Sequence, residues 1–446
     1  MPENATIGGG RRPRFCLATL GCKVNQYESQ AIRERLLADG YAEVSFGEPC
    51  SVAVINTCMV TGDACRKSRK RIHRAARGSP GATILVTGCL AELEADKLRA
   101  MPGVTHVIPK AQMGRIAQIL RGENPAHGSV FDLAISAFEG RTRAFLKIED
   151  GCESFCSYCV VPSARGRIRS RDPREIRCEA ERLLAAGFKE IVLTGIRLGM
   201  YGADLDGRGR VEDVIEDMLR LQGLERLRLS SLEVAEVSDR LIALMAAEPR
   251  LCPHLHIALQ SGDEAILRAM RRRYTSTEYL AALDRVRAKV AEPSFTTDVL
   301  VGFPGESEAQ YANTLAACRK AGFARAHVFR FSPRPGTPAA SLPDRVPEGV
   351  AREREHRAEE LARELALAYK QKFLGKLVYP LVERERDRAT GQLCGYTERY
   401  LQVAFDGPDE LKGRIVPVMA QRCTAASITG RRESADNDCG EVAIIP

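Results

Sequence analysis

The chain has 446 residues, of which 44% are hydrophobic and fifteen are cysteine, and its formal net charge is +8. This composition is that of a globular protein with two or three domains, and the absence of any run of about eighteen apolar residues excludes a membrane-spanning helix. Because the N-terminus also lacks the apolar segment of a signal peptide, we expect a cytoplasmic protein whose cysteines act as thiols or metal ligands rather than as disulfides.

Strand-like and helix-like segments alternate in the first third of the chain. The segments "RFCLATLGC", "SVAVINTC" and "ATILVTGC" predict three buried strands, and helices are expected at about residues 26–39, 63–76 and 90–100. Such an alternation is typical of a parallel sheet, in which ligands bind beyond the carboxyl ends of the strands. Each predicted strand ends at a cysteine, and we expect these cysteines to converge at one edge of the sheet: Cys22, Cys58 and Cys89.

Six further strand-like segments, separated by helices, fill the middle of the chain. They are "AFLKIED", "EIVLTGI", "RLRLSSLE", "HLHIALQ", "FTTDVLVGF" and "RAHVFRFSP". The pattern predicts a full or partial βα barrel, with its chemistry at the carboxyl ends of the strands. Three cysteines with the spacing C-x3-C-x2-C come directly after the first of these segments, where a functional loop is expected: Cys152, Cys156 and Cys159.

The pattern changes again near the C-terminus. A charged helix is expected at about residues 348–373, and from about Leu374 onward short strands alternate with polar turns, which predicts a small all-β module of barrel type. We therefore expect an α/β protein with three domains: a parallel-sheet α/β domain at residues 12–122, a partial (β/α)6 barrel at 138–370 and a small β-barrel at 371–435.

The C-x3-C-x2-C loop offers three thiolates and no fourth ligand. Three thiolates can hold three irons of a [4Fe–4S] cluster and leave the fourth iron open, whereas the alternative is a structural zinc site completed by a distant cysteine or histidine. The position of the loop after the first strand of a six-strand βα pattern, together with Tyr158 before the last cysteine, resembles the signature of the radical S-adenosylmethionine (radical SAM) enzymes. The resemblance implies that S-adenosylmethionine chelates the open iron and is cleaved to a 5′-deoxyadenosyl radical.

The motifs around the first three cysteines, "TLGCKVNQYES", "INTCMVTGDA" and "VTGCLAE", resemble the N-terminal domain of the methylthiotransferases. The resemblance implies that Cys22, Cys58 and Cys89 hold a second [4Fe–4S] cluster, again with one open iron. The alternative for each of these cysteines, taken alone, is that it is a small buried hydrophobic side chain. The other nine cysteines match no ligand motif, and we expect them to be core or surface thiols.

The resemblance extends from about Arg14 to Arg431, and the C-terminal module is similar to the RNA-binding TRAM domain of the same family. The segments "GCKVNQYES", "RKSRKR", "TGIRLGMYG" and "RRRYT" most resemble the branch that acts on N6-threonylcarbamoyladenosine at position 37 of tRNA. This implies a tRNA methylthiotransferase that uses two [4Fe–4S] clusters, S-adenosylmethionine, a protein reductant and an unidentified sulfur donor. Two alternatives stay open: the branch that acts on N6-isopentenyladenosine, and an RNA-binding protein in which metal only braces the fold.

Six residues near predicted strand ends are expected to contact S-adenosylmethionine, and no catalytic residue is expected beyond the clusters. Tyr158 lies within the cysteine loop, and the others belong to "SSLE", "HIALQSG" and "TTDVLVGFPG". A glycine at such a position is also a common turn residue, and the two histidines of "HLHIALQ" are expected to be packing residues. The expected contacts are Tyr158, Ser231, Glu233, Gln260, Asp298 and Gly302.

Two basic segments are candidates for contact with tRNA phosphates. The segment "CRKSRKRIHRAARG" has seven lysines or arginines and no acidic residue on a predicted helix, although a charge run is also the usual sequence of a solvated helix face. The second segment is "RAMRRRYTS", and in the C-terminal module basic residues are interspersed with tyrosines, a combination that suits RNA. The expected RNA contacts are Arg66, Lys67, Arg69, Lys70, Arg71, Arg271, Arg272 and Arg273.

Overall fold

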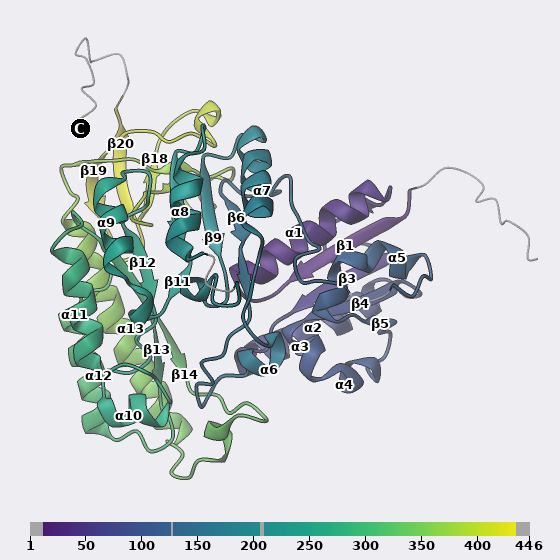
Figure 1. Ribbon diagram of the computed structural model, residues 1–446, viewed down its shortest axis with the longest axis horizontal. Helices are drawn as coiled ribbons and strands as arrows, with labels where there is room; N and C mark the ends of the chain where they lie inside the picture. Colours follow the sequence, from purple (N-terminus) through teal and green to yellow (C-terminus); the bar gives the residue numbers. More distant parts are fainter. Residues whose placement is uncertain (1–11, 126–127, 206–208, 434–446) are drawn as a thin grey trace, which may run out of the picture. The chain divides into compact units, whose positions relative to one another are not determined.

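The computed structural model of the chain describes residues 12–125, 128–205 and 209–433 (Figure 1). The chain divides into two compact units: the first comprises Met1–Ala137 and Cys159–Arg167, and the second comprises Phe138–Tyr158 and Ile168–Pro446. The last two residues of the third expected domain, 434 and 435, lie outside the described residues. None of the helices in the described part of the chain is long and apolar enough to cross a membrane.

The first unit is built on a five-stranded sheet with the strand order β2-β1-β3-β4-β5, and every pairing in it is parallel. All six residues of the central strand β3 are buried, as its largely apolar sequence requires. The predicted parallel sheet is therefore confirmed. Its strands are β1 (Arg14–Thr19), β2 (Ala42–Glu43), β3 (Val52–Thr57), β4 (Thr83–Gly88) and β5 (His106–Val107).

Two of the three helices expected in this unit are present, as α1 (Lys23–Ala38) and α2 (Gly62–Gly78). The single helix expected at residues 90–100 is wrong. Glu94, with φ −126° and ψ 35°, leaves the helical conformation and divides this segment into two short helices, α3 (Cys89–Leu93) and α4 (Ala95–Arg99). The unit also contains a 3₁₀ helix (Lys110–Arg115), α5 (Ile116–Leu120) and α6 (Val161–Arg165).

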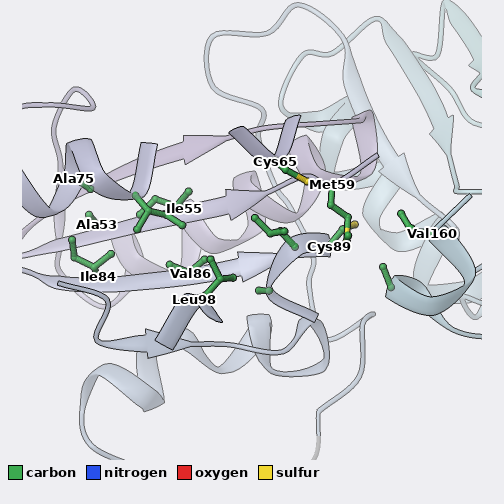
Figure 2. Packing of buried hydrophobic residues seen from close by; sticks show 14 of the residues in the cluster. Ala53, Ile55, Met59, Cys65, Ala75, Ile84, Val86, Cys89, Leu98 and Val160 are labelled. Atoms are coloured by element: carbon green, nitrogen blue, oxygen red, sulfur yellow. The ribbon is translucent and has the colours of Figure 1, made fainter. Parts of the chain in front are cut away.

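A buried apolar cluster packs α2, α3 and α6 against the first sheet (Figure 2). Val160 and Ala164 belong to this cluster, so the segment that follows the last cysteine of the C-x3-C-x2-C loop is part of the first unit's core. The inner stripe of α2 repeats every three or four residues, as one face of a helix does. Its members are Cys65, Ser68, Ile72 and Ala75.

The second unit contains the predicted partial barrel, formed by two parallel sheets with the orders β10-β9-β6 and β11-β12-β13-β14. Leu227 and Leu251 form a parallel bridge, and the Cys252 backbone N donates to Leu227 O at 2.8 Å, so backbone pairing continues from one sheet to the other. The strands are β6 (Ala144–Lys147), β9 (Glu190–Thr194), β10 (Arg226–Leu229), β11 (Ser231–Leu232), β12 (His254–Ile257), β13 (Ser294–Val301) and β14 (Arg325–Arg330).

Helices alternate with these strands, and several begin at a residue whose side chain caps the helix. Ser238, Thr275 and Ser307 each accept a hydrogen bond from a backbone N–H of the first helical turn. The helices are α7 (Pro173–Ala185), α8 (Val211–Leu219), α9 (Asp239–Ala247), α10 (Glu264–Ala269), α11 (Ser276–Arg287), α12 (Glu308–Ala321) and α13 (Glu348–Gln371). Short 3₁₀ helices lie at Leu198–Met200, Val234–Glu236 and Pro338–Ser341.

The C-terminal module is a six-stranded sheet with the order β15-β19-β20-β18-β17-β16. The sheet curls back on itself, because the edge strand β16 pairs with the segment that leads into β19: the Val382 N donates to Arg414 O at 2.9 Å, and the Gly413 N donates to Val382 O at 2.9 Å. The predicted small β-barrel is thereby confirmed. The strands are β15 (Leu377–Val378), β16 (Leu381–Val382), β17 (Leu393–Tyr396), β18 (Gln402–Phe405), β19 (Val418–Cys423) and β20 (Ile428–Arg432).

Buried arginines hold this module against the amino-terminal ends of the barrel strands. The Arg228 side chain is 1% exposed, forms an ion pair with Glu190 at 2.7 Å, and donates to the carbonyl groups of Thr397 (2.9 Å) and Glu398 (2.8 Å). Its guanidinium group also lies over the ring of Tyr400. The amino-terminal end of the barrel is therefore occupied by structural contacts, and the carboxyl end carries the cysteine loop.

Candidate active site

Three cysteines lie at the carboxyl edge of the five-stranded sheet. Cys22 occupies the position before the first residue of α1, after β1, Cys58 directly follows β3, and Cys89 directly follows β4 as the first residue of α3. Because β1, β3 and β4 are neighbours in the sheet, the strand order brings the three positions to the same edge. In Figure 2, Met59, Cys65 and Cys89 lie together beyond the ends of these strands.

Two glycines allow the cysteine loops to approach one another. A Cβ atom at Gly21 (φ +102°) would lie 2.9 Å from the Cβ and 3.0 Å from the Sγ of Cys58. A Cβ atom at Gly88 (φ +92°) would lie 2.4 Å from the backbone O of Thr57. Both residues have the left-handed φ that favours glycine. Since each directly precedes a cysteine, the Gly-Cys pairs in the sequence reflect a requirement of the backbone at this edge.

Asn25, on the first turn of α1, joins the loops that carry the first two cysteines. Its Nδ2 donates to Leu20 O at 2.8 Å and to Thr57 O at 3.0 Å. Its Oδ1 accepts from the Cys22 thiol at 3.7 Å and from the Arg165 Nη2 at 2.7 Å. The buried Asn25 amide therefore fixes the backbone before Cys22 and before Cys58, and it contacts the Cys22 thiol.

Arg165 connects this network to α6. Its Nη1 forms an ion pair with Glu28 at 3.0 Å, and both side chains are 1% exposed. The Lys110 Nζ donates to the backbone O of Ala164, the residue before it. Removal of one partner of a buried ion pair strongly destabilises the folded protein. The pair of Glu28 and Arg165 therefore anchors α6 beside the cysteines at the sheet edge.

The three thiols at this edge differ in exposure. Cys58 and Cys89 are each 6% exposed, whereas Cys22 retains an accessible surface. Burial raises the pKa of Cys58 to about 12, and the atoms packed around the Cys22 sulfur also raise its pKa through desolvation. The Cys22 and Cys58 thiols are therefore protonated at neutral pH in the absence of metal, and binding of iron would release their protons.

Among the residues that the structure describes, no three histidine, cysteine or acidic side chains are arranged to hold a metal ion. The donor set at the sheet edge nevertheless fits an iron–sulfur cluster, which is wider than one ion and takes thiolates as ligands. Three thiols are available, and Gly21 and Gly88 let the loops that carry them approach one another closely. The residues present therefore fit the group that the resemblance implies.

The C-x3-C-x2-C loop follows β6 and β7 (Glu149–Asp150) directly, where it was expected. The Cys152 thiol donates to the Ser154 Oγ at 3.4 Å, and this hydroxyl accepts from the Arg197 Nη1 at 2.9 Å. The Ser157 N donates to Met270 O at 3.0 Å, at the end of α10. The loop is thus held by hydrogen bonds to the segment after β9 and to the end of α10.

Glu149 lies just before this loop and is fully buried. Its Oε2 accepts from the Arg197 backbone N at 2.8 Å, while its Oε1 has no hydrogen-bond partner within the described part of the chain. Burial raises the pKa of Glu149 to about 8. A carboxyl group in such a site is stable when protonated, because the neutral form avoids the cost of a buried charge.

All six expected S-adenosylmethionine contacts lie in the second unit. Tyr158 is half-buried and packs against the apolar cluster that includes Met270 and Phe303. Ser231 belongs to β11, and Glu233 follows that strand. Gln260 has a left-handed φ of 63°, and its backbone N donates to Asp298 O at 2.9 Å. Their contact with the cofactor stays a prediction.

Asp298 and Gly302, the other two expected contacts, have partners of their own. The Asp298 Oδ2 lies 3.5 Å from the His256 Nε2. Gly302 has φ +71°, its N donates to the Glu306 Oε2 at 2.8 Å, and a Cβ atom there would lie 2.8 Å from the Ala351 Cβ. Turn geometry and close packing against α13 thus account for this glycine, and its expected cofactor contact stays a prediction.

The basic segment on α2 presents its charges outward. Arg66, Lys67, Lys70 and Arg71 are exposed, and Arg66 also forms an ion pair with Asp63, while the half-buried Arg69 forms one with Glu94. A hollow of about 580 Å³ runs along this face. It is lined by Arg66, Arg69, Lys70, His73 and Arg77.

The second basic segment does not face outward as a whole. Arg271 and Arg273 are exposed, but the Arg272 side chain is only 5% exposed and forms an ion pair with Glu233. Its Nη1 also lies 3.4 Å from the Cys156 Sγ. The structure does not support the expected RNA contact at Arg272, because a buried, paired guanidinium group cannot reach a phosphate.

The sequence did not reveal the side chains that position the two sets of cysteines: Asn25, Glu28 and Arg165 at the sheet edge, and Arg197 at the C-x3-C-x2-C loop. The available signal was the polar run "NQYES" on a helix that must pack against a sheet. A carboxylate on the buried side of such a helix requires a cation, although the sequence does not say which one.

Of the other nine cysteines, Cys439 lies outside the described residues.

Comparison with known proteins finds two family models that match separate parts of the chain. Residues 14–109 match the model of an uncharacterized protein family, UPF0004, and residues 146–318 match that of the radical SAM superfamily. The radical S-adenosylmethionine methyltransferase TsrM from Kitasatospora setae has a similar fold, with a TM-score of 0.56 and 14% identity over 74% of this chain and 77% of that one. Fold and site thus define a radical SAM enzyme, a class that uses S-adenosylmethionine and a [4Fe–4S] cluster.

Relatives narrow the family further. Threonylcarbamoyladenosine tRNA methylthiotransferase MtaB of Bacillus subtilis (strain 168) is 39% identical over 415 residues, which cover 90% of this chain and 92% of that protein. The tRNA-2-methylthio-N(6)-dimethylallyladenosine synthase of Acidothermus cellulolyticus is 36% identical over 456 residues, with coverage of 96% and 91%. The chain belongs to the radical SAM methylthiotransferase family, which confirms the resemblance seen in the sequence.

Proposed function

We propose that this enzyme methylthiolates N6-threonylcarbamoyladenosine at position 37 of tRNA, giving the 2-methylthio derivative. The observation that carries the proposal is the meeting of Cys22, Cys58 and Cys89 at one sheet edge, in a chain that also has the C-x3-C-x2-C loop. The choice of nucleoside is supported by the 39% identity to the Bacillus subtilis protein named for that substrate.

Two [4Fe–4S] clusters are part of the proposal, one on Cys152, Cys156 and Cys159 and the other on the three cysteines of the sheet edge. When bound, these clusters and S-adenosylmethionine supply the radical that activates adenine C2 and the methylthio group that replaces its hydrogen. The chain's own residues hold the ligands in place. Asn25 and Arg165 fix the loops at the sheet edge, and Ser154 and Arg197 fix the C-x3-C-x2-C loop.

We propose that tRNA binds with its phosphates on the outer face of α2, through Arg66, Lys67, Arg69, Lys70 and Arg71. The hollow along that face and the exposure of four of these cations support this role. Arg271 and Arg273, which are also exposed, are additional candidates. The curled C-terminal sheet supports a TRAM-like RNA-binding role, and a tRNA substrate supports a cytoplasmic location.

A second candidate function is methylthiolation of N6-isopentenyladenosine. The observation in its favour is the 36% identity to the Acidothermus cellulolyticus protein, over 96% of this chain. The two candidates share the clusters and the reaction and differ only in the group on N6. An electron donor and a sulfur source are required in both, and we propose that the electrons come from a reductant protein.

Nucleoside mass spectrometry of tRNA from a deletion strain separates the candidates. We expect 2-methylthio-N6-threonylcarbamoyladenosine to disappear on deletion and to return with the wild-type chain. The Cys22→Ala and Cys152→Ala variants should not restore it, whereas Cys178→Ala, at an exposed position outside both sites, should restore it fully. Loss of the 2-methylthio-isopentenyl nucleoside instead would contradict the proposed substrate and favour the second candidate.

A further inference from the structure

Arg272 is the buried member of three consecutive arginines at the end of α10. Its neighbour Arg271 has the left-handed φ of 58°, which is uncommon for a residue with a side chain. The chain therefore turns sharply after Met270, and the Arg272 backbone N donates to Leu267 O at 2.9 Å. This turn leaves Arg271 and Arg273 exposed while the Arg272 side chain enters the protein.

The Arg272 guanidinium group has a different partner on each side. Its Nη1 donates to the Cys156 Sγ at 3.4 Å, and its Nη2 forms an ion pair with Glu233. Its Nε donates to the Tyr274 Oη at 3.2 Å, and the group lies 4.9 Å from the centre of that ring. These contacts hold the guanidinium group in one orientation with a donor directed at the sulfur.

The Tyr274 hydroxyl completes this arrangement from behind. It lies 2.8 Å from Ala258 O and 2.7 Å from Leu259 O, so its own proton is used on the backbone. Its oxygen is therefore left to accept from Arg272. The charge cannot be lost, because an arginine side chain stays protonated in proteins, and Cys156 is only 8% exposed. A fixed positive charge in such a site acts on the sulfur with little screening by water.

Hydrogen bonds to cysteine sulfurs and nearby charges are among the factors that set the reduction potential of iron–sulfur clusters. A cationic donor on Cys156 stabilises the more negative, reduced state of a cluster bound there. We propose that Arg272 is a positioning residue that orients Cys156 and raises the reduction potential of the cluster held by Cys152, Cys156 and Cys159. The proposal rests on the cluster assignment made under the proposed function.

The paired carboxylate of Glu233 opposes this effect. It places a negative charge on the far side of the guanidinium group and reduces the positive charge felt at the sulfur. Arg272 and Glu233 therefore set the potential in opposite directions, and their replacement should shift it with opposite signs. A purely structural pair would not do so.

The test is redox titration of the cluster, followed by electron paramagnetic resonance, without S-adenosylmethionine. The full chain carries Cys22→Ala, Cys58→Ala and Cys89→Ala so that only one cluster contributes. We expect Arg272→Gln to lower the ratio of reduced to oxidised cluster at a fixed potential about tenfold, which is ~59 mV for one electron. Arg272→Lys should lower it less, and Glu233→Gln should raise it. Arg268→Gln, at an exposed position on α10, should leave it unchanged.

Several results would overturn the proposal. An unchanged potential in Arg272→Gln with full iron content is one, and a fall in potential in Glu233→Gln is another. Weaker binding of S-adenosylmethionine with an unchanged potential would assign Arg272 to the cofactor instead. If Arg272→Gln does not retain iron, the other two variants still test the proposal, because the reduction potential should fall in Arg272→Lys and rise in Glu233→Gln. Absence of iron from the parent chain would instead contradict the proposed function.

Discussion

The two sets of three cysteines are assembled by different means. Cys152, Cys156 and Cys159 belong to one short loop, whereas Cys22, Cys58 and Cys89 are far apart in sequence and meet because β1, β3 and β4 are neighbours. The first set depends on local hydrogen bonds such as those of Ser154 and Ser157. The second depends on the whole fold of its unit, and a lesion anywhere in that sheet can separate its ligands.

The largest expected effect comes from removing one ligand of each set. Cys152→Ala should abolish cleavage of S-adenosylmethionine and therefore all product, because the loop that has lost one of its three thiolates no longer holds the cluster that binds the cofactor. Cys22→Ala should leave cleavage intact and stop methylthiolation. Release of 5′-deoxyadenosine and formation of the modified nucleoside, measured in the same reaction, separate the two roles. Methylthiolated product from Cys22→Ala would show that the sheet edge does not hold the second cluster.

The sheet-edge site should be sensitive to a change in the backbone that brings its cysteines together. Gly88→Ala adds a Cβ atom 2.4 Å from Thr57 O at a left-handed φ of +92°, and we expect a loss of about 2–5 kcal/mol in the free energy of unfolding. The matched variant is Gly81→Ala, where φ is +81° and nothing lies within 4 Å. It should cost only about 1 kcal/mol. Equal losses in denaturant unfolding would contradict this account of the edge.

The loop site should instead respond to pH through Glu149, whose pKa burial raises to about 8. The folded chain binds this proton more tightly than the unfolded chain, so its contribution to stability is complete below about pH 4.5 and is lost as the pH rises towards 8. Glu149→Gln should therefore match the wild type near pH 4.5 and exceed it by up to about 5 kcal/mol at pH 8. Denaturant unfolding across this range measures the difference.

A matched variant distinguishes this effect from a general change of charge. The control is Glu410→Gln, which removes the same charge at an exposed position. If Glu149→Gln is least stable relative to the wild type at pH 8, the buried carboxyl group is not the origin of the dependence.

The smallest expected effect concerns a surface outside both cysteine sets. Replacing Lys67, Lys70 and Arg71 with glutamine should make the affinity for tRNA less dependent on salt. The negative slope of log affinity against log salt should become shallower by about 2, because each phosphate contact contributes about 0.7–0.9 to its magnitude. Cleavage of S-adenosylmethionine without tRNA should not change. A control set of three exposed cations, Lys289, Arg319 and Lys320, should leave the slope unaltered. Equal slopes for both sets would exclude α2 as the phosphate-binding face.

The sequence predicted the sheet-edge convergence because strand periodicity and the rules of parallel sheets act over long distances. The sequence patterns likewise predicted the six strand segments of the barrel, one of which forms the two short strands β10 and β11, and the curled C-terminal sheet. The break of the expected helix at Glu94 was missed, because helical propensity is continuous through "CLAELEADKLRA" and only the tertiary structure divides it.

The direction of single charged side chains could not be predicted. Three consecutive arginines look equivalent in the sequence, but the left-handed backbone at Arg271 sends Arg272 inward to Glu233 and Cys156. The partner of Glu28 was equally hidden, because Arg165 is far away in sequence and meets it only through the packing of α6. Charge patterns identify candidate surfaces, and the backbone decides which members of a pattern reach them.

The central claim is that the chain holds two clusters, one on the C-x3-C-x2-C loop and one on the cysteines of the sheet edge. Iron and sulfide analysis after anaerobic reconstitution tests it most directly, on the wild type and on two triple variants that replace either set of cysteines with alanine. We expect about eight irons per chain in the wild type and about four in each variant, since each cluster contains four. Tightly bound zinc without iron, or the same iron content in all three proteins, would contradict the account.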